Sequence, residues 1–309
     1  MHRRLFLAGA IAASALPLMG HSPYRKWTQY RARHTVIVTD RSDAESFPLG
    51  ERLAAHLAAQ RPELSATASR AQSSATVLSL LRTRQVDIAL LRGEDAYQGL
   101  HGAGSYAALA TPLRALVGVA PEYLYVLVPA RSEIRTMAQL KGCRVGVVDV
   151  SSGRVQSKIR RLAAAAGLDP EVDVRWSALR PSDVTAALDR DEVDVSCFES
   201  PLLGPARALP RLANDRRLRA VAQEDALRVL IDRYDPIYFP ASPSEDAKAD
   251  LQLDGPVLGE VRLLVCREDY PAERAQVLAE ALGGWDGLAP RKTPLPIPLH
   301  PAVTALAAD

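Results

Sequence analysis

The stretch LKGCRVGVVDVSSGRVQSKIRRLAAAAG, residues 140–167, decides how we interpret the rest of this chain. A β-branched run from Val145 to Val150 is interrupted by Ser151, Ser152 and Gly153, and apolar residues then recur at helical spacing as far as Gly167. The pattern predicts a strand, a polar turn and a helix. Backbone N–H groups at such a helix start are unpaired and lie at the positive end of the helix dipole. We therefore predict that this turn binds an anion or a carboxylate.

Four basic residues, Arg154, Lys158, Arg160 and Arg161, follow the turn. Runs of like charge on a helix usually form a solvated face, and we interpret Lys158, Arg160 and Arg161 in that way. Arg154 lies next to the turn and is the one that we retain as a binding residue.

The composition indicates a globular protein, and its charge balance does not suggest nucleic-acid binding. The chain has 309 residues, of which 48% are hydrophobic and 24% charged. Its 38 Lys and Arg residues nearly balance its 36 Asp and Glu residues. This length permits one large domain or two lobes.

The first residues have the order of an export signal. His2, Arg3 and Arg4 precede an apolar stretch, Leu5–Leu18, which is too short for an ordinary membrane span. We predict a leader over residues 1–20, a basic and aromatic linker over 21–34, and a periplasmic location. RRLFL resembles the twin-arginine pattern, but the general secretory route stays open. The alternative is an uncleaved anchor with the linker at the membrane interface.

Strand and helix patterns alternate on either side of the opening stretch, which predicts parallel sheets. The predicted strands occupy residues 35–39, 64–69, 86–92, 172–176 and 193–198, and the predicted helices residues 49–60, 73–85 and 183–190. Two further strands, 113–120 and 123–129, lead to a crossover at Pro129. We predict that residues 35–128 and 255–309 form one lobe and residues 129–254 the other.

Polar turns follow the predicted strands. In open α/β sheets, ligands bind outside the carboxyl ends of the strands. The turns at 40–47, 73–74, 92–97, 151–154 and 199–201 all lie at such ends. Together they would line a cleft between the two lobes.

Four strings resemble one known family: QVDIALLRGEDAYQGLHG (85–102), MAQLKGCRVGVVDVSSG (137–153), LIDRYDPIYFPAS (230–242) and, most specifically, TPLPIPLHPA (293–302). They resemble the TAXI family, the solute-binding subunits of TRAP-type transporters. The resemblance implies a type II periplasmic binding protein-like fold, α/β, with two lobes that are mainly parallel sheets flanked by helices. It also implies capture of a small solute between the lobes and delivery to a TRAP-type membrane permease.

Only some of the family's ligand-binding positions have matching residues in this sequence. FPLG, beginning at Phe47, resembles the start of the family's first helix, but DRSDAES replaces the glycine-rich loop before it. Val77 stands where an Asn is usual and Arg92 where a Gln is common. Turns and resemblance together give the candidate ligand-binding residues Ser46, Phe47, Ser73, Ser74, Arg92, Tyr97, Ser151, Ser152, Gly153, Arg154 and Glu199.

The chemistry of these residues favours an anionic solute, a carboxylate or an amino acid. A planar guanidinium suits bidentate carboxylate recognition, and Arg92 and Arg154 would face the cleft from opposite lobes. Glu199 would bind an ammonium group or pair with one of these arginines. The alternative is that both arginines form surface pairs with Asp40, Asp43 or Glu199. Tyr97 would stack on the solute or pack in the core.

The motifs of enzymes and metal sites are missing from the sequence. There is no GxSxG, Walker lysine or GxGxxG, and the histidines are scattered. We expect a monomer that is not an enzyme and has no cofactor or metal, with Cys143, Cys197 and Cys266 as buried free thiols. A different interpretation is a periplasmic sensor or accessory protein of the same fold without a transport role.

Proline spacing near the carboxyl end predicts an extended segment. Prolines at 294, 296, 298 and 301 fix φ and disfavour helix at their neighbours. We expect the segment to cross the body as a strap with Leu295, Ile297 and Leu299 turned inward.

Overall fold

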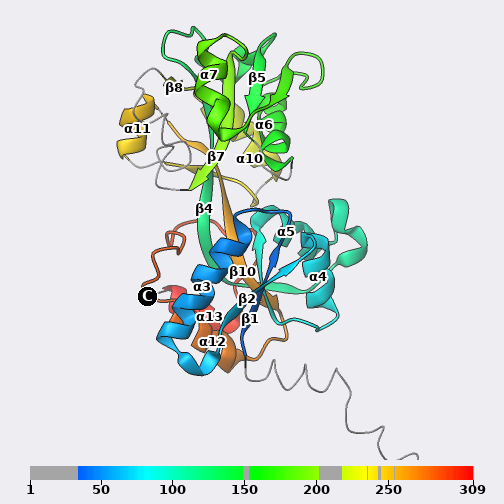
Figure 1. The fold of residues 1–309 in the computed structure, drawn as a ribbon. Helices are drawn as coiled ribbons and strands as arrows, with labels where there is room; N and C mark the ends of the chain where they lie inside the picture. Colours follow the sequence, from blue (N-terminus) through cyan, green and yellow to red (C-terminus); the bar gives the residue numbers. More distant parts are fainter. Residues whose placement is uncertain are drawn as a thin grey trace, which may run out of the picture.

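The computed structural model describes residues 34–148, 153–201, 218–234, 236–242, 245–253 and 255–308. The predicted leader, nearly all of the linker, Ser151 and Ser152 lie outside the described residues. Figure 1 shows two lobes joined by two long strands. The strands are β1 (Val36–Asp40), β2 (Thr67–Ala71), β3 (Ile88–Arg92), β4 (Leu113–Pro129), β5 (Arg144–Val147), β6 (Arg175–Ala178), β7 (Val195–Pro201), β8 (Leu218–Ala220), β9 (Phe239–Ala241) and β10 (Val257–Arg267).

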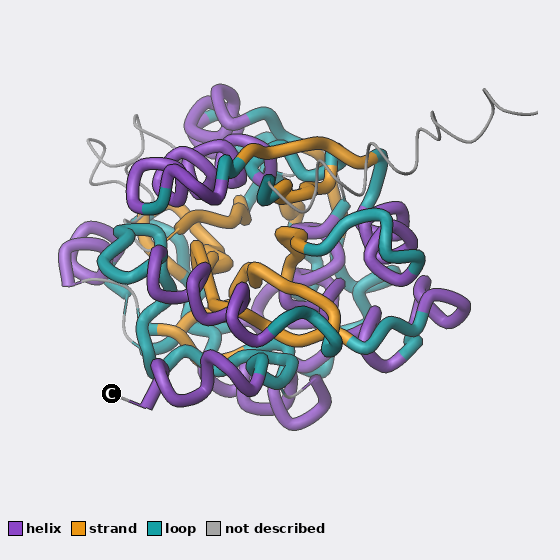
Figure 2. The backbone as a smooth tube through the Cα atoms, turned by 90° about the horizontal axis from the view of Figure 1, so that it is seen from below, coloured by secondary structure: helices purple, strands orange, loops and turns teal. Residues whose placement is uncertain are grey.

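Helices surround these strands, as the view from below shows in Figure 2. The α-helices are α3 (Ser46–Gln60), α4 (Ser74–Arg82), α5 (Gly93–His101), α6 (Arg154–Ala165), α7 (Val184–Asp189), α10 (Glu224–Tyr234), α11 (Glu245–Leu251), α12 (Ala272–Ala281) and α13 (Pro301–Ala308). Short 3₁₀ turns cover Pro62–Leu64, Gly104–Leu109, Met137–Leu140 and Pro181–Asp183. Among the described residues, no helix has both the length and the hydropathy to cross a membrane.

The described strands form one mixed sheet of ten strands, with β8 and β9 joining at its sides. In the first lobe, β2, β1 and β3 are parallel neighbours, and in the second lobe β6, β5 and β7 are parallel neighbours. The strands β4 and β10 run antiparallel to each other and to β7 and β3, respectively. The predicted α/β class with parallel strands in each half is therefore confirmed.

The connection between the lobes differs from the prediction. We expected two strands, 113–120 and 123–129, but they form the single strand β4 of 17 residues. Ala120 has φ +41° within it, and the register against β10 shifts between Glu260 and Arg262, so the strand absorbs the irregularity without ending. Pro129 ends this strand and pairs with Leu218 of β8, whereas Glu122, near the middle of the strand, pairs with Glu260 of β10.

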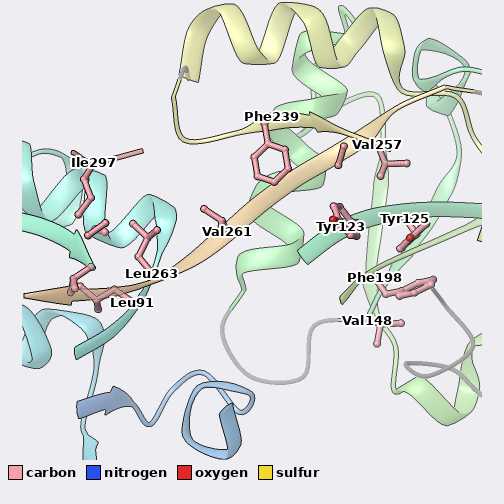
Figure 3. Packing of buried hydrophobic residues seen from close by; sticks show 14 of the residues in the cluster. Leu91, Tyr123, Tyr125, Val148, Phe198, Phe239, Val257, Val261, Leu263 and Ile297 are labelled. Carbon is pink, nitrogen blue, oxygen red and sulfur yellow. The ribbon is translucent and has the colours of Figure 1, made fainter. Parts of the chain in front are cut away.

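Side chains alternate across β10 and so join different cores on its two faces. One face carries Val257, Val261, Leu263 and Val265, all in one apolar cluster that continues from the first lobe into the second. Figure 3 shows this cluster along β10, from Leu91 and Ile297 to Tyr125 and Phe198. We call it the apolar spine.

The opposite face of β10 carries Leu258, Glu260, Arg262 and Leu264. Leu258 belongs to the core of the second lobe, beneath α6 and α10, whereas Leu264 belongs to the core of the first lobe, beneath α3 and α12. Glu260 and Arg262 lie between these two cores and are almost fully buried. Charged residues thus occupy the gap between two apolar cores.

The carboxyl-terminal segment packs as predicted. Ile297 is buried, and Leu295 and Leu299 pack against the apolar spine. The backbone N–H of Ala115 donates to the carbonyl of Pro298, and the N–H of His300 donates to the carbonyl of Ala115. The strap is therefore attached to β4 by backbone hydrogen bonds before α13 begins.

The cysteines are free thiols. Cys197 and Cys266 are buried, as predicted, whereas Cys143 is only half-buried. Burial, the largest effect, raises the pKa of the Cys266 thiol to about 12. A thiol of this kind is unreactive and packs as a small apolar side chain.

Candidate binding site between the lobes

Charged side chains meet where the carboxyl ends of β1, β3 and β7 and the first turns of α5 and α6 approach the middle of β4 and β10. We call this group the ionic cluster. Its members are the carboxylates Asp40, Asp43, Glu94, Asp95, Glu122, Glu199 and Glu260 and the cations Arg92, Arg154, Lys158, Arg161 and Arg262.

Arg92 lies at the centre of the cluster, at the end of β3. Its Nε donates to Asp43 at 2.9 Å, and its Nη1 donates to Glu122 at 2.7 Å and to Glu199 at 3.2 Å. The side chain is 9% exposed. The guanidinium therefore links the first lobe, the middle of β4 and strand β7 of the second lobe.

Two carboxylates face each other on the joining strands, because Glu122 is the register partner of Glu260. Like charges in this position repel each other, and buried ones need cations nearby. Arg262 donates to Glu122 at 2.5 Å and to Asp43, and Lys158 of α6 forms ion pairs with Glu199 and Glu260. The carboxylates between the two cores thus pair with cations from both lobes.

Burial and ion pairing act in opposite directions on the pKa values of these carboxylates. For Glu260, burial raises the pKa, but Lys158 and Arg92 outweigh it and lower the value from 4.5 to about 2. For Asp43, burial likewise raises the pKa, and Arg262 and Arg92 bring it well below its usual range. Both groups are therefore ionised at neutral pH although they are buried.

Arg154 crosses from the second lobe to the first. Its Nη1 pairs with Asp95 at 2.8 Å, and its Nη2 lies 3.6 Å from Asp40 and 3.4 Å from the hydroxyl of Ser74. The Ser74 hydroxyl lies within 2.9 Å of both carboxylates, and Tyr106 donates its hydroxyl proton to Asp95. Burial and then Asp95 raise the pKa of Tyr106 well above its usual value. Arg154 thus faces a buried group of carboxylates and hydroxyls.

A third crossing contact lies about two helical turns further along α6 than Arg154. Arg161 pairs with Glu94 of α5 at 2.8 Å and donates to the hydroxyl of Tyr238 at 2.6 Å. That hydroxyl donates to the other carboxylate oxygen of Glu94 at 2.9 Å. The three groups close a triangle of hydrogen bonds with two corners in the second lobe and one in the first.

The structure brings together only part of the candidate ligand-binding set. Ser74, Arg92, Arg154 and Glu199 belong to the ionic cluster or contact it directly, and the hydroxyl of Ser46 donates to Asp43 at 3.3 Å. The network that holds these residues has two parts: Arg92, Glu199 and Ser46 lie around Asp43 and Glu122, whereas Arg154 and Ser74 lie around Asp40 and Asp95.

The other described candidates lie apart from this network. Phe47 packs under the guanidinium of Arg70, whose carbon is 3.7 Å from the ring centroid. Ser73 caps α4 by accepting from the N–H of Thr76. Tyr97 packs against the cores of both lobes and lies beside His101.

The turn before α6 is described only at Gly153. Gly153 is exposed with φ +66°, a conformation that glycine adopts without strain. Its neighbours Ser151 and Ser152 lie outside the described residues.

The interpretation of Lys158 and Arg161 as a solvated face was wrong. Lys158 is 2% exposed, and Arg161 binds Glu94, whereas Arg160 lies at the surface with Glu171. Residues 154, 158 and 161 follow the spacing i, i+4, i+7 and therefore share one face of α6. That spacing is the signal in the sequence that could have separated them from Arg160.

Asp43, Glu122, Glu260 and Arg262 were not among the candidates. In the sequence, Glu260 and Arg262 alternate with apolar residues, a pattern typical of a strand with one solvated face. Their burial arises because α6 and the loop before α3 cover this face of the two joining strands. Single-sequence periodicity does not contain that information.

The fold and the site define a two-lobed α/β protein with a charged interface between its lobes. The chain belongs to the NMT1-like family, whose model matches residues 42–283. Among curated proteins, no sequence matches the chain.

Several solved structures are similar to this chain. The alkanesulfonate-binding protein SsuA from Xanthomonas axonopodis pv. citri, bound to MOPS, has 18% identity and a TM-score of 0.40, with 82% of this chain and 74% of that chain covered. The periplasmic aliphatic sulphonate binding protein SsuA from Escherichia coli has 20% identity and a TM-score of 0.42, with coverages of 82% and 68%. XAC2383 from Xanthomonas citri, bound to ATP, has 14% identity and a TM-score of 0.47, with coverages of 81% and 82%.

Proposed function

We propose that this protein is an extracytoplasmic solute-binding protein of the TAXI type, which captures a small solute between its lobes and delivers it to a TRAP-type permease. The observation that carries the proposal is the ionic cluster, because it gathers charged groups of both lobes at the carboxyl ends of the strands. Membership of the NMT1-like family and the motifs at 85–102 and 293–302 support it.

The solute class follows from the charges in the cluster. Arg92 and Arg154 suit a carboxylate, as the sequence predicts. The described cluster holds seven carboxylates and five cations, so a purely anionic solute would enter a site with an excess of negative charge. Within the predicted class of carboxylates and amino acids, an amino acid fits better, because its ammonium group balances the negative charge of its own carboxylate and can pair with a carboxylate of the cluster.

The lobes that would move have boundaries within the joining strands. Leu124, Val126 and Val128 of β4, and Leu258 of β10, pack in the core of the second lobe. We therefore place the boundaries near Glu122 and Glu260 instead of at residues 128 and 255. A hinge at these positions would open the ionic cluster and leave each apolar core intact.

A ligand panel tests the proposal. The purified protein is heated with single amino acids and small carboxylates, and any compound that raises the melting temperature is titrated by calorimetry. We expect at least one amino acid to bind and Arg154→Ala to weaken its binding by about tenfold or more. Arg180→Ala, which alters an exposed pair on the second lobe, is the control. No binding by any compound would contradict a solute-binding role.

The second candidate, a sensor or accessory protein without a transport role, is favoured by one observation. Each guanidinium of the cluster already pairs with a carboxylate of this chain, so no guanidinium of the cluster needs a solute as its partner. Co-purification from membranes distinguishes the two candidates. A many-span permease bound to the protein would support transport, and a sensor kinase would support the second candidate.

A further inference from the structure

One face of α6 carries several of the ionic contacts between the lobes. Arg154, Lys158 and Arg161 recur at positions i, i+4 and i+7, so all three side chains leave the helix on the same side. The opposing helix α5 begins with Glu94 and Asp95 in its first turn. A basic helix face of the second lobe therefore lies against an acidic helix start of the first.

These contacts are complete within the chain. Arg154 meets Asp95 at 2.8 Å, and Arg161 meets Glu94 at 2.8 Å, with the Tyr238 hydroxyl as a third partner of both Arg161 and Glu94. Glu94 has two further hydrogen bonds: its backbone N–H donates to the Glu260 carboxylate, and its side chain accepts from Gln98. Glu94 is thus positioned by contacts other than its pair with Arg161.

We propose that α5 and α6 form an ionic latch, Arg154 with Asp95 and Arg161 with Glu94, which closes the two lobes on each other without a solute. The latch goes beyond the proposed function, because it depends on contacts of the chain with itself and on no particular solute. A solute that enters between the lobes competes with the latch for Arg154.

The chemistry of the latch makes it reversible. Closing removes water from four charged groups, and this cost offsets most of the attraction between them. Opening returns the same groups to water, where they are well solvated. An apolar interface of the same size would resist opening, because exposing apolar surface to water is unfavourable. The latch therefore favours the closed state by only a small free energy, and one missing partner shifts the balance.

Distance measurements between the lobes test the latch. Spin labels are attached at Glu51→Cys on α3 and Asp189→Cys on α7, both exposed, in a Cys143→Ser background, and the distances are measured by pulsed electron paramagnetic resonance in solute-free buffer. We expect a dominant short distance in the otherwise unchanged protein. Glu94→Gln leaves Arg161 without its charged partner and should raise the ratio of open to closed molecules about tenfold or more.

Three comparisons make the result decisive. The double variant Glu94→Arg with Arg161→Glu exchanges the charges and should restore the short distance. Arg180→Gln, which breaks an exposed pair with Asp183, should leave the distances unchanged. If Glu94→Gln does not fold, as judged by circular dichroism, Tyr238→Phe replaces it, because it removes one hydroxyl that contacts Glu94.

A long distance in the parent protein would overturn the latch, and so would identical distances in the parent and in Glu94→Gln or its substitute. These measurements use no solute. A negative ligand panel would therefore contradict the proposed function and leave the latch intact, and open lobes would contradict the latch alone.

Discussion

The two faces of the joining strands hold the lobes together by different means. On one face, the apolar spine runs without interruption from Leu91 through Leu263 to Phe198. On the other face, two separate apolar cores are divided by the ionic cluster around Glu122 and Glu260. The apolar packing over these two strands is thus continuous on one face and interrupted by charged residues on the other.

The difference separates stability from movement. Apolar burial stabilises in proportion to the area removed from water and depends little on salt or pH. Buried ion pairs contribute little net stability, but they become costly when one partner is lost. We infer that the apolar spine fixes the fold, whereas the ionic cluster sets how readily the lobes separate.

The largest expected effect comes from removing one cation of the cluster. Arg262→Leu leaves Asp43 and Glu122 with one cation fewer in a buried site, and we expect a loss of about 4 kcal/mol in the free energy of unfolding. Urea denaturation at pH 7 measures the change. A loss below about 1 kcal/mol would mean that water reaches the carboxylates and that the cluster is not buried.

A slightly smaller effect is expected on the apolar spine. Leu263→Ala removes a fully buried side chain and should cost about 3 kcal/mol by loss of burial and by the cavity that remains. The cost should be the same in low and high salt, unlike that of changes in the ionic cluster. A cost that changes with salt would show that the two faces are not independent.

An intermediate effect is expected from acid. The pKa of Glu260 is lowered in the folded protein from 4.5 to about 2, so its contribution to stability is complete above pH 4.5 and is lost as the pH falls toward about 2. Glu260→Gln removes this titration. The difference in urea midpoint between the parent protein and the variant should therefore shrink between pH 5 and about pH 2.5. A constant difference would contradict the pairing of Glu260 with Lys158.

The smallest effect is expected at the surface. Arg180→Ala breaks a pair with Asp183 in which the arginine side chain is 81% exposed, and it should change the free energy of unfolding by less than about 1 kcal/mol. The same urea experiment checks it. A larger change would mean that the contrast between buried and exposed pairs does not hold in this protein.

The sequence predicts the units of the fold well because they depend on local periodicity. Val145 and Val147 of the valine run lie in β5, the helix that follows ends before Gly167, and the prolines near Ile297 form the strap. It does not predict that residues 113–129 make one strand, because Ala120 interrupts the pattern without ending the pairing with β10.

The candidate site is predicted less well, for a physical reason. Arg92, Arg154 and Glu199 follow from the positions of turns; Arg92 pairs with Glu199, and Arg154 pairs with Asp95 of the same cluster. Glu122, Glu260 and Lys158 lie on elements whose charges look solvated in the sequence, and only the approach of the two lobes buries them. Burial that arises between lobes leaves no periodic signal in either lobe.

Small-angle X-ray scattering of the unmodified protein at increasing salt tests most directly whether the ionic cluster governs the separation of the lobes. Salt screens the attraction between complementary charges and favours the open state, in which those charges are hydrated. We predict that the radius of gyration rises between low salt and 1 M salt while the circular dichroism spectrum stays unchanged. A radius of gyration that stays constant over this range would contradict the account, because the lobes would then be held by the apolar spine alone.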